Sequence, residues 1–146
     1  MRNVVKVILI AAFTLAAAHS GNAQVRLYGG KYSDPDKWFA GAGFEIGVIP
    51  IIKIIPSYEY VFTDVGHFYT LSVDGTINFL VVGYAGAGVG WNFMGGGGAD
   101  SRNSTALNIL AGVDLNRIPL SPFAQVKYVS FSQGGSTWSF GVGIHI

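Results

Sequence analysis

"GYAGAGVGWNF", residues 83 to 93, contains glycine at positions 83, 86, 88 and 90. A glycine-rich loop that binds a dinucleotide has the pattern G-x-G-x-x-G between a strand and a helix. Here Gly86, Gly88 and Gly90 recur at every second position, with apolar residues between them. A period of two is typical of a β-strand, because its successive side chains point to opposite faces. The stretch therefore predicts a strand with one face of small residues and one apolar face.

The same alternation recurs along most of the chain after Gln24. Near the end of the chain, for example, Trp138, Phe140 and Val142 share one face, and small or polar residues occupy the positions between them. No segment there shows the sustained 3.6-residue periodicity of an amphipathic helix. The sequence therefore predicts eight strands, over residues 25–32, 39–48, 51–61, 68–79, 82–94, 105–115, 121–131 and 137–146.

Asp74 and Gly75 interrupt this pattern with a dipeptide that is typical of hairpin turns. A turn at this position would leave two strands too short to cross an apolar membrane layer about 25 Å thick. We therefore expect one continuous strand over residues 68–79, with the next turn near Leu80 and Val81.

The composition decides which face of the strands points inward. Of the 146 residues, 50% are hydrophobic and only 12% are charged, which is about half of the usual charged fraction of roughly a quarter. A face in contact with water carries many lysines and glutamates, whereas the polar face here is rich in glycine, serine, threonine and asparagine. The apolar face is therefore expected to contact lipid and the polar face to line a narrow lumen. The predicted fold is all-β, an eight-stranded antiparallel up-and-down transmembrane β-barrel.

Most of the charges within the predicted strands fall on the polar face, and they have both signs. In a narrow lumen, buried charges of this kind are tolerated when they form ion pairs. The sequence predicts a lumen charge network that consists of Arg26, Glu45, Lys53, Glu59, Asp74, Asp114 and Lys127. We expect the glycines of residues 83–93 to make room for bulky members of this network, such as Arg26 and Lys127.

Loop lengths and aromatic positions indicate which end of the barrel faces outward. The outer loops of transmembrane barrels are longer than the turns at the other end, and the longest predicted outer loop is "GGGGADSRNS", residues 95–104. Near the same end, aromatic residues on the apolar face form the pattern of a girdle at a lipid headgroup layer. The predicted girdle comprises Trp38, Tyr58, Tyr60, Tyr69, Trp91, Tyr128 and Trp138.

The beginning of the chain has the pattern of a secretory signal peptide. Basic residues precede an apolar run over residues 7–18, and Gly21 and Ala23 are small residues of the kind that a signal peptidase reads. The run is shorter than the roughly 20 residues that a spanning helix needs, which argues against the alternative of a membrane anchor. We therefore expect export and cleavage after Ala23, which divides the chain into a signal peptide (1–23) and a barrel domain (24–146).

Three motifs connect the chain with a known family. Residues 83–93 contain the pattern Y-x-G-A-G-x-G, residues 121–128 read "SPFAQVKY", and the last strand carries Ser139, Gly141, Ile144 and Ile146. In these motifs the chain resembles the small outer-membrane β-barrel proteins, the group that includes the OmpA transmembrane domain and OmpX. In that group the last strand carries an assembly signal for the barrel-insertion machinery. This chain departs from the signal by ending in isoleucine, where an aromatic residue is usual.

The resemblance implies an integral outer-membrane protein of a Gram-negative bacterium with a structural or surface-interaction role. A wide pore is not expected, because eight strands enclose a filled lumen. The implied partners are outer-membrane lipid, lipopolysaccharide and, through the C-terminal strand, the barrel-insertion machinery. Asp100, Arg102 and Asn103, within residues 95–104, are candidate contacts with lipopolysaccharide sugars or with an extracellular protein that the sequence does not identify.

Two other functions stay open on the sequence alone. An outer-membrane enzyme that modifies lipid A needs a histidine that can activate a nucleophile. His67 has no serine beside it, and His145 is expected to fill the lumen near the periplasmic end, so no catalytic residue is assigned. The second alternative, a soluble periplasmic ligand-binding barrel, would have an apolar lumen.

Other classes of site find no support in the sequence. The chain has no cysteine and three histidines, and its carboxylates do not have the spacing of a metal site, so neither a metal nor a cofactor is expected. The net charge of +1 gives no argument for binding to nucleic acid.

Overall fold

The computed structural model describes residues 23–34, 36–64, 66–79, 81–96 and 99–146. Most of the predicted signal peptide, residues 1–22, lies outside the described residues, so its cleavage stays a prediction. Within the described part no helix is long and apolar enough to cross a membrane. The strands are β1 (Ala23–Tyr32), β2 (Trp38–Ile49), β3 (Ile52–Val61), β4 (His67–Phe79), β5 (Gly83–Gly96), β6 (Ala99–Asp114), β7 (Phe123–Phe131) and β8 (Ser136–His145).

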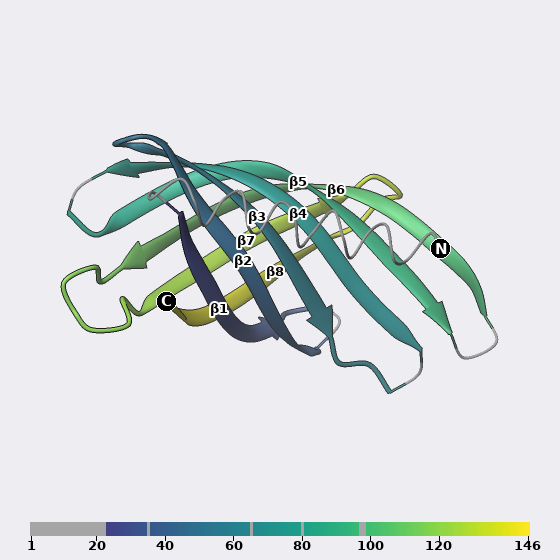
Figure 1. Cartoon of the computed structure of the whole chain (residues 1–146). Helices are drawn as coiled ribbons and strands as arrows, with labels where there is room; N and C mark the ends of the chain where they lie inside the picture. Colours follow the sequence, from purple (N-terminus) through teal and green to yellow (C-terminus); the bar gives the residue numbers. More distant parts are fainter. Residues whose placement is uncertain (1–22, 35, 65, 80, 97–98) are drawn as a thin grey trace, which may run out of the picture.

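Each strand pairs antiparallel with the next, and β8 pairs with β1 to close the barrel (Figure 1). This confirms the predicted eight-stranded antiparallel up-and-down barrel. The end that carries the β1–β2, β3–β4 and β7–β8 connections is called the loop end below. The opposite end, with the β2–β3 and β6–β7 connections, is called the turn end.

The continuous strand predicted across Asp74 and Gly75 is confirmed, because both residues lie inside β4. They pair with Gly88 and Ala87 of β5. The hairpin dipeptide therefore makes no turn here. Neighbouring strands on both sides hold its backbone extended, since a ladder satisfies the backbone N–H and C=O groups that would otherwise be unpaired.

The prediction of an outer loop over residues 95–104 is wrong. β5 continues to Gly96 and β6 begins at Ala99, so most of this stretch is a hairpin that extends the barrel wall. Arg102 pairs with Met94, and a register shift follows between Met94 and Gly96. A bulge of this kind absorbs an irregular stretch without ending the pairing. The first two glycines of the run, Gly95 and Gly96, therefore belong to β5.

The side chains on the two faces of the wall differ as the membrane prediction requires. In β6, Leu107 and Ile109 are each 64% exposed on the outside, whereas Asn108 between them is 3% exposed and faces the lumen. A soluble ligand-binding barrel would have the opposite arrangement, with an apolar lumen, so that alternative is wrong. Near the loop end the lumen also holds a small apolar cluster of Tyr32, Phe39 and Val61.

Gly88 shows why the lumen face of β5 consists of glycines. Its neighbours across the strand pairs are Asp74 of β4 and Asn108 of β6. Asn108 Nδ2 donates a 3.0 Å hydrogen bond to Asp74 Oδ1, and this bond passes over Gly88. A Cβ atom at Gly88 would overlap the Asp74 carboxylate and the Val73 carbonyl oxygen.

Atoms of the neighbouring strands therefore occupy the space beside these glycines. The atoms nearest to an added Cβ at Gly86 belong to Gly75 and Thr76 of β4, and at Gly90 they belong to Ser72, Thr70 and Asn108. The expectation that bulky side chains such as Arg26 and Lys127 use this space stays a prediction. Lys127 Nζ lies 3.6 Å from Asp74 Oδ2, and the same carboxylate covers Gly88.

Leucine introduced at two adjacent positions tests this packing. We expect Gly88→Leu to destabilise the barrel by about 3 kcal/mol, at the upper end of the usual cost of overpacking, because overlap with backbone atoms of β4 cannot relax by side-chain rotation. Val89→Leu places the same side chain on the lipid-facing wall, where Val89 is 40% exposed, and is expected to change little. Urea unfolding in detergent micelles measures both. Equal stability of the two variants would contradict the packing argument.

Candidate functional site in the barrel lumen

The charged residues of the predicted network lie in the lumen and form two groups. Arg26, Glu45, Glu59, Asp74, Asp114 and Lys127 are each 6% exposed or less. The side chain of Lys53 is 21% exposed. One group, called the Lys127 cluster, contains Lys127, Glu59 and Asp74. The other lies at the turn end, contains Arg26, Glu45, Lys53 and Asp114, and is joined there by His145.

The Lys127 cluster connects opposite walls of the barrel. Lys127 Nζ of β7 lies 3.0 Å from Glu59 Oε1 of β3 and 3.6 Å from Asp74 Oδ2 of β4. In the closed strand order β3 and β7 are diametrically opposite. Tyr28 and Tyr32 of β1 also donate hydrogen bonds to Glu59, of 3.0 and 2.6 Å. These contacts fill the cross-section of the lumen.

Glu45 is the centre of the turn-end cluster. Its carboxylate forms an ion pair with Lys53 of β3 and lies 3.8 Å from Arg26 Nε of β1. The Arg26 guanidinium also stacks over the Phe123 ring at 4.0 Å and donates to the Tyr84 hydroxyl at 3.3 Å. With Asp114 of β6 and His145 of β8, seven strands therefore contribute a side chain to this end of the lumen.

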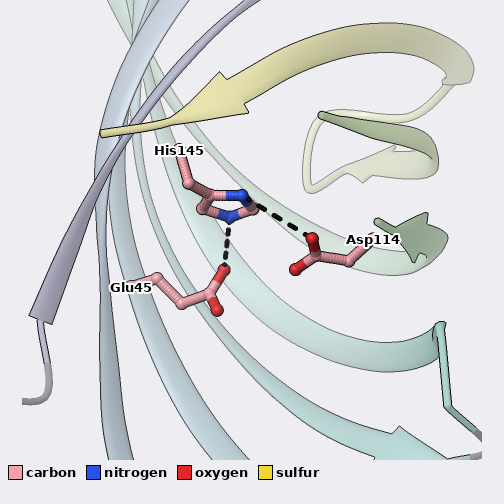
Figure 2. Close-up of side chains that lie close together, drawn as sticks. All are labelled: Glu45, Asp114 and His145. Atoms are coloured by element: carbon pink, nitrogen blue, oxygen red, sulfur yellow. Dashed lines mark hydrogen bonds and ion pairs between the residues drawn. The ribbon is translucent and has the colours of Figure 1, made fainter. Parts of the chain in front are cut away.

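His145, which was expected only to fill the lumen, belongs to this cluster. Figure 2 shows the imidazole between two carboxylates, with Nε2 3.0 Å from Glu45 Oε2 and Nδ1 3.7 Å from Asp114 Oδ1. Its position in the alternation of β8 already indicated a lumen-facing residue. Because the barrel closes, His145 pairs with Arg26 of β1. This pairing places His145 at the same height along the barrel axis as the charged residues of the turn-end cluster.

Glu45, Asp114 and His145 have the residue types of a metal site, and their ligand atoms lie within 4.8 Å of one another. Lys53 and Arg26 already form ion pairs with Glu45. Their positive charges oppose the entry of a divalent cation. The geometry therefore favours ion pairing within the protein over metal binding.

The residues of the predicted girdle lie on the outer wall, toward the loop end. Trp38 begins β2 and Trp138 is the third residue of β8, both at this end, and they are 63% and 48% exposed. Tyr128 packs against Trp138 with ring centroids 5.0 Å apart, and Tyr58 packs against Tyr69 at 5.8 Å. The girdle members not yet placed, Tyr60 and Trp91, are outward-facing residues of β3 and β5.

An apolar groove with a volume of about 1030 Å³ crosses the outer wall from β6 to β2. Small residues, including Gly29, Ala111 and Ala124, line it. At its loop end Lys31 Nζ lies 5.5 Å from the centre of the Trp38 ring. The groove thus combines an apolar surface with one cation near the girdle.

The candidate surface contacts lie in a strand and not in a loop. Asp100, Arg102 and Asn103 all belong to β6, and the side chains of Arg102 and Asn103 are exposed. In the connections of the loop end, Lys37 Nζ donates a 2.8 Å hydrogen bond to Asp64 Oδ2. This bond holds the pKa of the exposed Asp64 carboxyl below its usual value.

The residues of the predicted assembly signal lie in the last strand and in the residue after it. Ser139 is buried in the lumen, whereas Gly141 and Ile144 are half-buried. Ile146 is 66% exposed, and its backbone forms hydrogen bonds with Val25 of β1 in both directions.

Removal of the Lys127 amine tests the energetic role of the Lys127 cluster. We expect Lys127→Met to cost about 3–5 kcal/mol, because it leaves Glu59 and Asp74 without the cation that compensates their buried charges. Lys127→Met combined with Glu59→Gln should recover part of the loss. Lys37→Met, at an exposed ion pair, is the control and should have a much smaller effect. Urea unfolding in micelles compares the four proteins, and a Lys127→Met stability equal to that of the control would refute this role.

Comparison with protein-family models and with curated proteins gives no match for this sequence. Solved structures do match. Neisserial surface protein A aligns with a TM-score of 0.62 and 17% identity over 84% of this chain and 94% of that protein. The de novo designed protein TMB2.3 aligns with a TM-score of 0.53 and 16% identity over 86% and 94%. The attachment invasion locus protein of Yersinia pestis, solved with the heparin analogue sucrose octasulfate, aligns with a TM-score of 0.50 and 21% identity over 85% and 97%.

At these identities the comparisons establish the architecture of the chain. The two bacterial proteins are small eight-stranded outer-membrane barrels, and the strand order and closure described above agree with theirs. The chain therefore has the fold of the small outer-membrane β-barrel proteins, as its resemblance to the OmpA and OmpX group implied.

Proposed function

We propose that the mature chain is an integral outer-membrane protein with a closed lumen and a structural or surface-interaction role. The observation that carries this proposal is the distribution of polarity over the wall. Charged groups such as Glu59 and Lys127 are buried and paired in the lumen, whereas large apolar side chains such as Val142 are 66% exposed on the outside. A protein in water has the reverse distribution, but a barrel in lipid requires this one.

The packing of the lumen supports a closed barrel over a wide pore. The apolar cluster of Tyr32, Phe39 and Val61 lies toward the loop end, the Lys127 cluster spans the lumen, and the turn-end cluster fills the opposite end. A solute that crossed the barrel would have to separate ion pairs in both clusters. Barrels with aqueous channels have twice as many strands.

Outer-membrane lipid and lipopolysaccharide are the partners that the outer wall fits. The groove beside Gly29 and Ala124 offers apolar surface to an acyl chain. Lys31 at its loop end forms an exposed ion pair with Asp36, with Nζ 2.6 Å from Oδ1, so this end of the groove is polar. The girdle residues offer rings with polar edges at the same level. The β5–β6 hairpin, with exposed Arg102 and Asn103, is the candidate contact with lipopolysaccharide sugars or with an extracellular protein.

The C-terminal strand is the proposed contact with the barrel-insertion machinery. This rests on the motif of Ser139, Gly141, Ile144 and Ile146 together with its place in β8, which closes the barrel against β1. The exposed side chain of Ile146 occupies the position of the usual terminal aromatic residue.

A non-enzymatic role accounts best for both histidines of the barrel. His145 Nδ1 contacts the backbone carbonyl of Ser121 and not its hydroxyl, so this pair is not a base with a nucleophile. His67 begins β4 at the loop end, where its side chain is exposed.

Cell fractionation tests the location. When the full chain is produced in a Gram-negative host, we expect the processed protein in the outer-membrane fraction, with an electrophoretic mobility that changes on heating. A folded barrel resists detergent until it is heated, which is the reason for the mobility change. Recovery of the protein in a soluble fraction without detergent would refute the membrane assignment. A purified, folded protein that forms large stable channels in planar bilayers would refute the closed lumen.

Lipid A mass spectrometry tests the absence of enzymatic activity. We expect the acylation and headgroup pattern of lipid A to be the same with and without the expressed protein. His67→Ala is the matched variant, because it removes the exposed histidine without touching the lumen. A new lipid A species that disappears in His67→Ala would establish the lipid-modifying alternative.

A further inference from the structure

The connection between β6 and β7 contains two residues in an unfavourable backbone conformation. Leu120 has a φ of 65° and Ser121 a φ of 35°, and within the described residues they are the non-glycine residues with positive φ. A non-glycine residue in this region is strained and persists only where the surrounding structure holds it. Contacts with the turn end of the barrel must therefore stabilise the strained conformation of this connection.

His145 makes the contacts that hold both residues. Its backbone N–H donates to the Leu120 carbonyl at 2.9 Å, and its ring Nδ1 lies 2.8 Å from the Ser121 carbonyl oxygen. The last residue of β8 thus binds the two strained residues, one through its backbone and one through its side chain.

The ring of His145 has acceptors at both nitrogens. Nδ1 faces the Ser121 carbonyl, and Nε2 lies 3.0 Å from Glu45 Oε2. A carbonyl accepts only, and a carboxylate that is paired with Lys53 and Arg26 is ionised and also accepts only. A neutral imidazole carries one N–H and satisfies one of these partners, whereas an imidazolium satisfies both.

The other groups around the ring are consistent with a cation. Asp114 of β6 lies 3.7 Å from Nδ1, and the Phe123 ring of β7 packs against the imidazole at 4.9 Å between centroids. The cations Arg26 of β1 and Lys53 of β3 are directed at Glu45. Tyr84 of β5 accepts from Arg26. Two carboxylates and two cations therefore surround the histidine.

We propose that protonated His145 is a pH-sensitive latch, which ties the strained β6–β7 connection to Glu45 and so closes the turn end of the barrel. When the ring loses its proton, one nitrogen presents a lone pair to an acceptor and that contact is lost. The latch is therefore closed at neutral pH, where Glu45 is ionised, and opens as the pH rises through the value at which the buried ring deprotonates.

Nuclear magnetic resonance of the full protein in detergent micelles tests the protonation state directly. We expect both imidazole nitrogens of His145 to carry a proton at neutral pH and one of them to lose it at higher pH. The exposed His67 in the same sample is the internal reference. A neutral His145 at neutral pH, with a single protonated nitrogen, would overturn the proposal even if every variant failed to fold.

Amide hydrogen exchange tests the mechanical consequence. The amides of Ile118 and Ser121 form hydrogen bonds within the connection, to Leu115 O and Ile118 O. We expect their protection factors to fall about tenfold or more when His145 deprotonates, because a hydrogen bond to a charged group is lost. His145→Gln should show the lower protection at every pH, and His67→Gln should behave as the native protein. Protection that does not change as His145 titrates would overturn the latch.

A glycine variant separates the latch from a general loss of packing. Glycine adopts a φ of 65° without strain, so Leu120→Gly in the His145→Gln background should recover part of the protection. Such a recovery would support the proposal that His145 stabilises a strained backbone conformation at Leu120. If Leu120→Gly lowers the protection further, the strained connection does not depend on His145 and the proposal fails.

Discussion

The pairing of β8 with β1 is the constraint on which the rest of the structure depends. A sheet with open edges would present unpaired backbone groups, which is prohibitive in lipid. Closure removes both edges and at the same time fixes the width of the lumen, because eight strands enclose space for side chains only. The glycines of β5, the buried ion pairs and the apolar outer wall are all consequences of this one geometric condition.

Closure also explains how so many charges remain buried. A single charge in a narrow lumen would have a large desolvation cost. Because opposite walls are close, Lys127 of β7 reaches Glu59 of β3, and the tyrosines of β1 satisfy the remaining lone pairs of that carboxylate. At the turn end Glu45 forms ion pairs with Lys53, Arg26 and His145, which come from three other strands. The charges thus join the walls to one another, as apolar side chains do in the core of a protein in water.

The parts that sequence patterns predicted well are those that depend on local periodicity. The alternation in residues 83–93 placed Gly88 on the lumen face and Val89 on the lipid face, and the structure agrees. The strand across Asp74 and Gly75 was predictable because a membrane sets a minimum strand length. By contrast, residues 95–104 have the composition of a loop. Gly95 and Gly96 nevertheless belong to β5 and residues 99–104 to β6, because the two strands continue to pair with each other, and composition contains no information about the partner.

The same distinction applies to the lumen site. The sequence by itself determined which residues face the lumen, because side chains alternate in any extended strand and the faces differ sharply in polarity. It did not show that His145 lies against Glu45 and holds the β6–β7 connection, nor that Lys127 pairs with Glu59. Those contacts join residues 100 and 68 positions apart in the chain. Only the register of all eight strands and their closure bring such residues to the same level of the barrel, so the tertiary structure alone decided them.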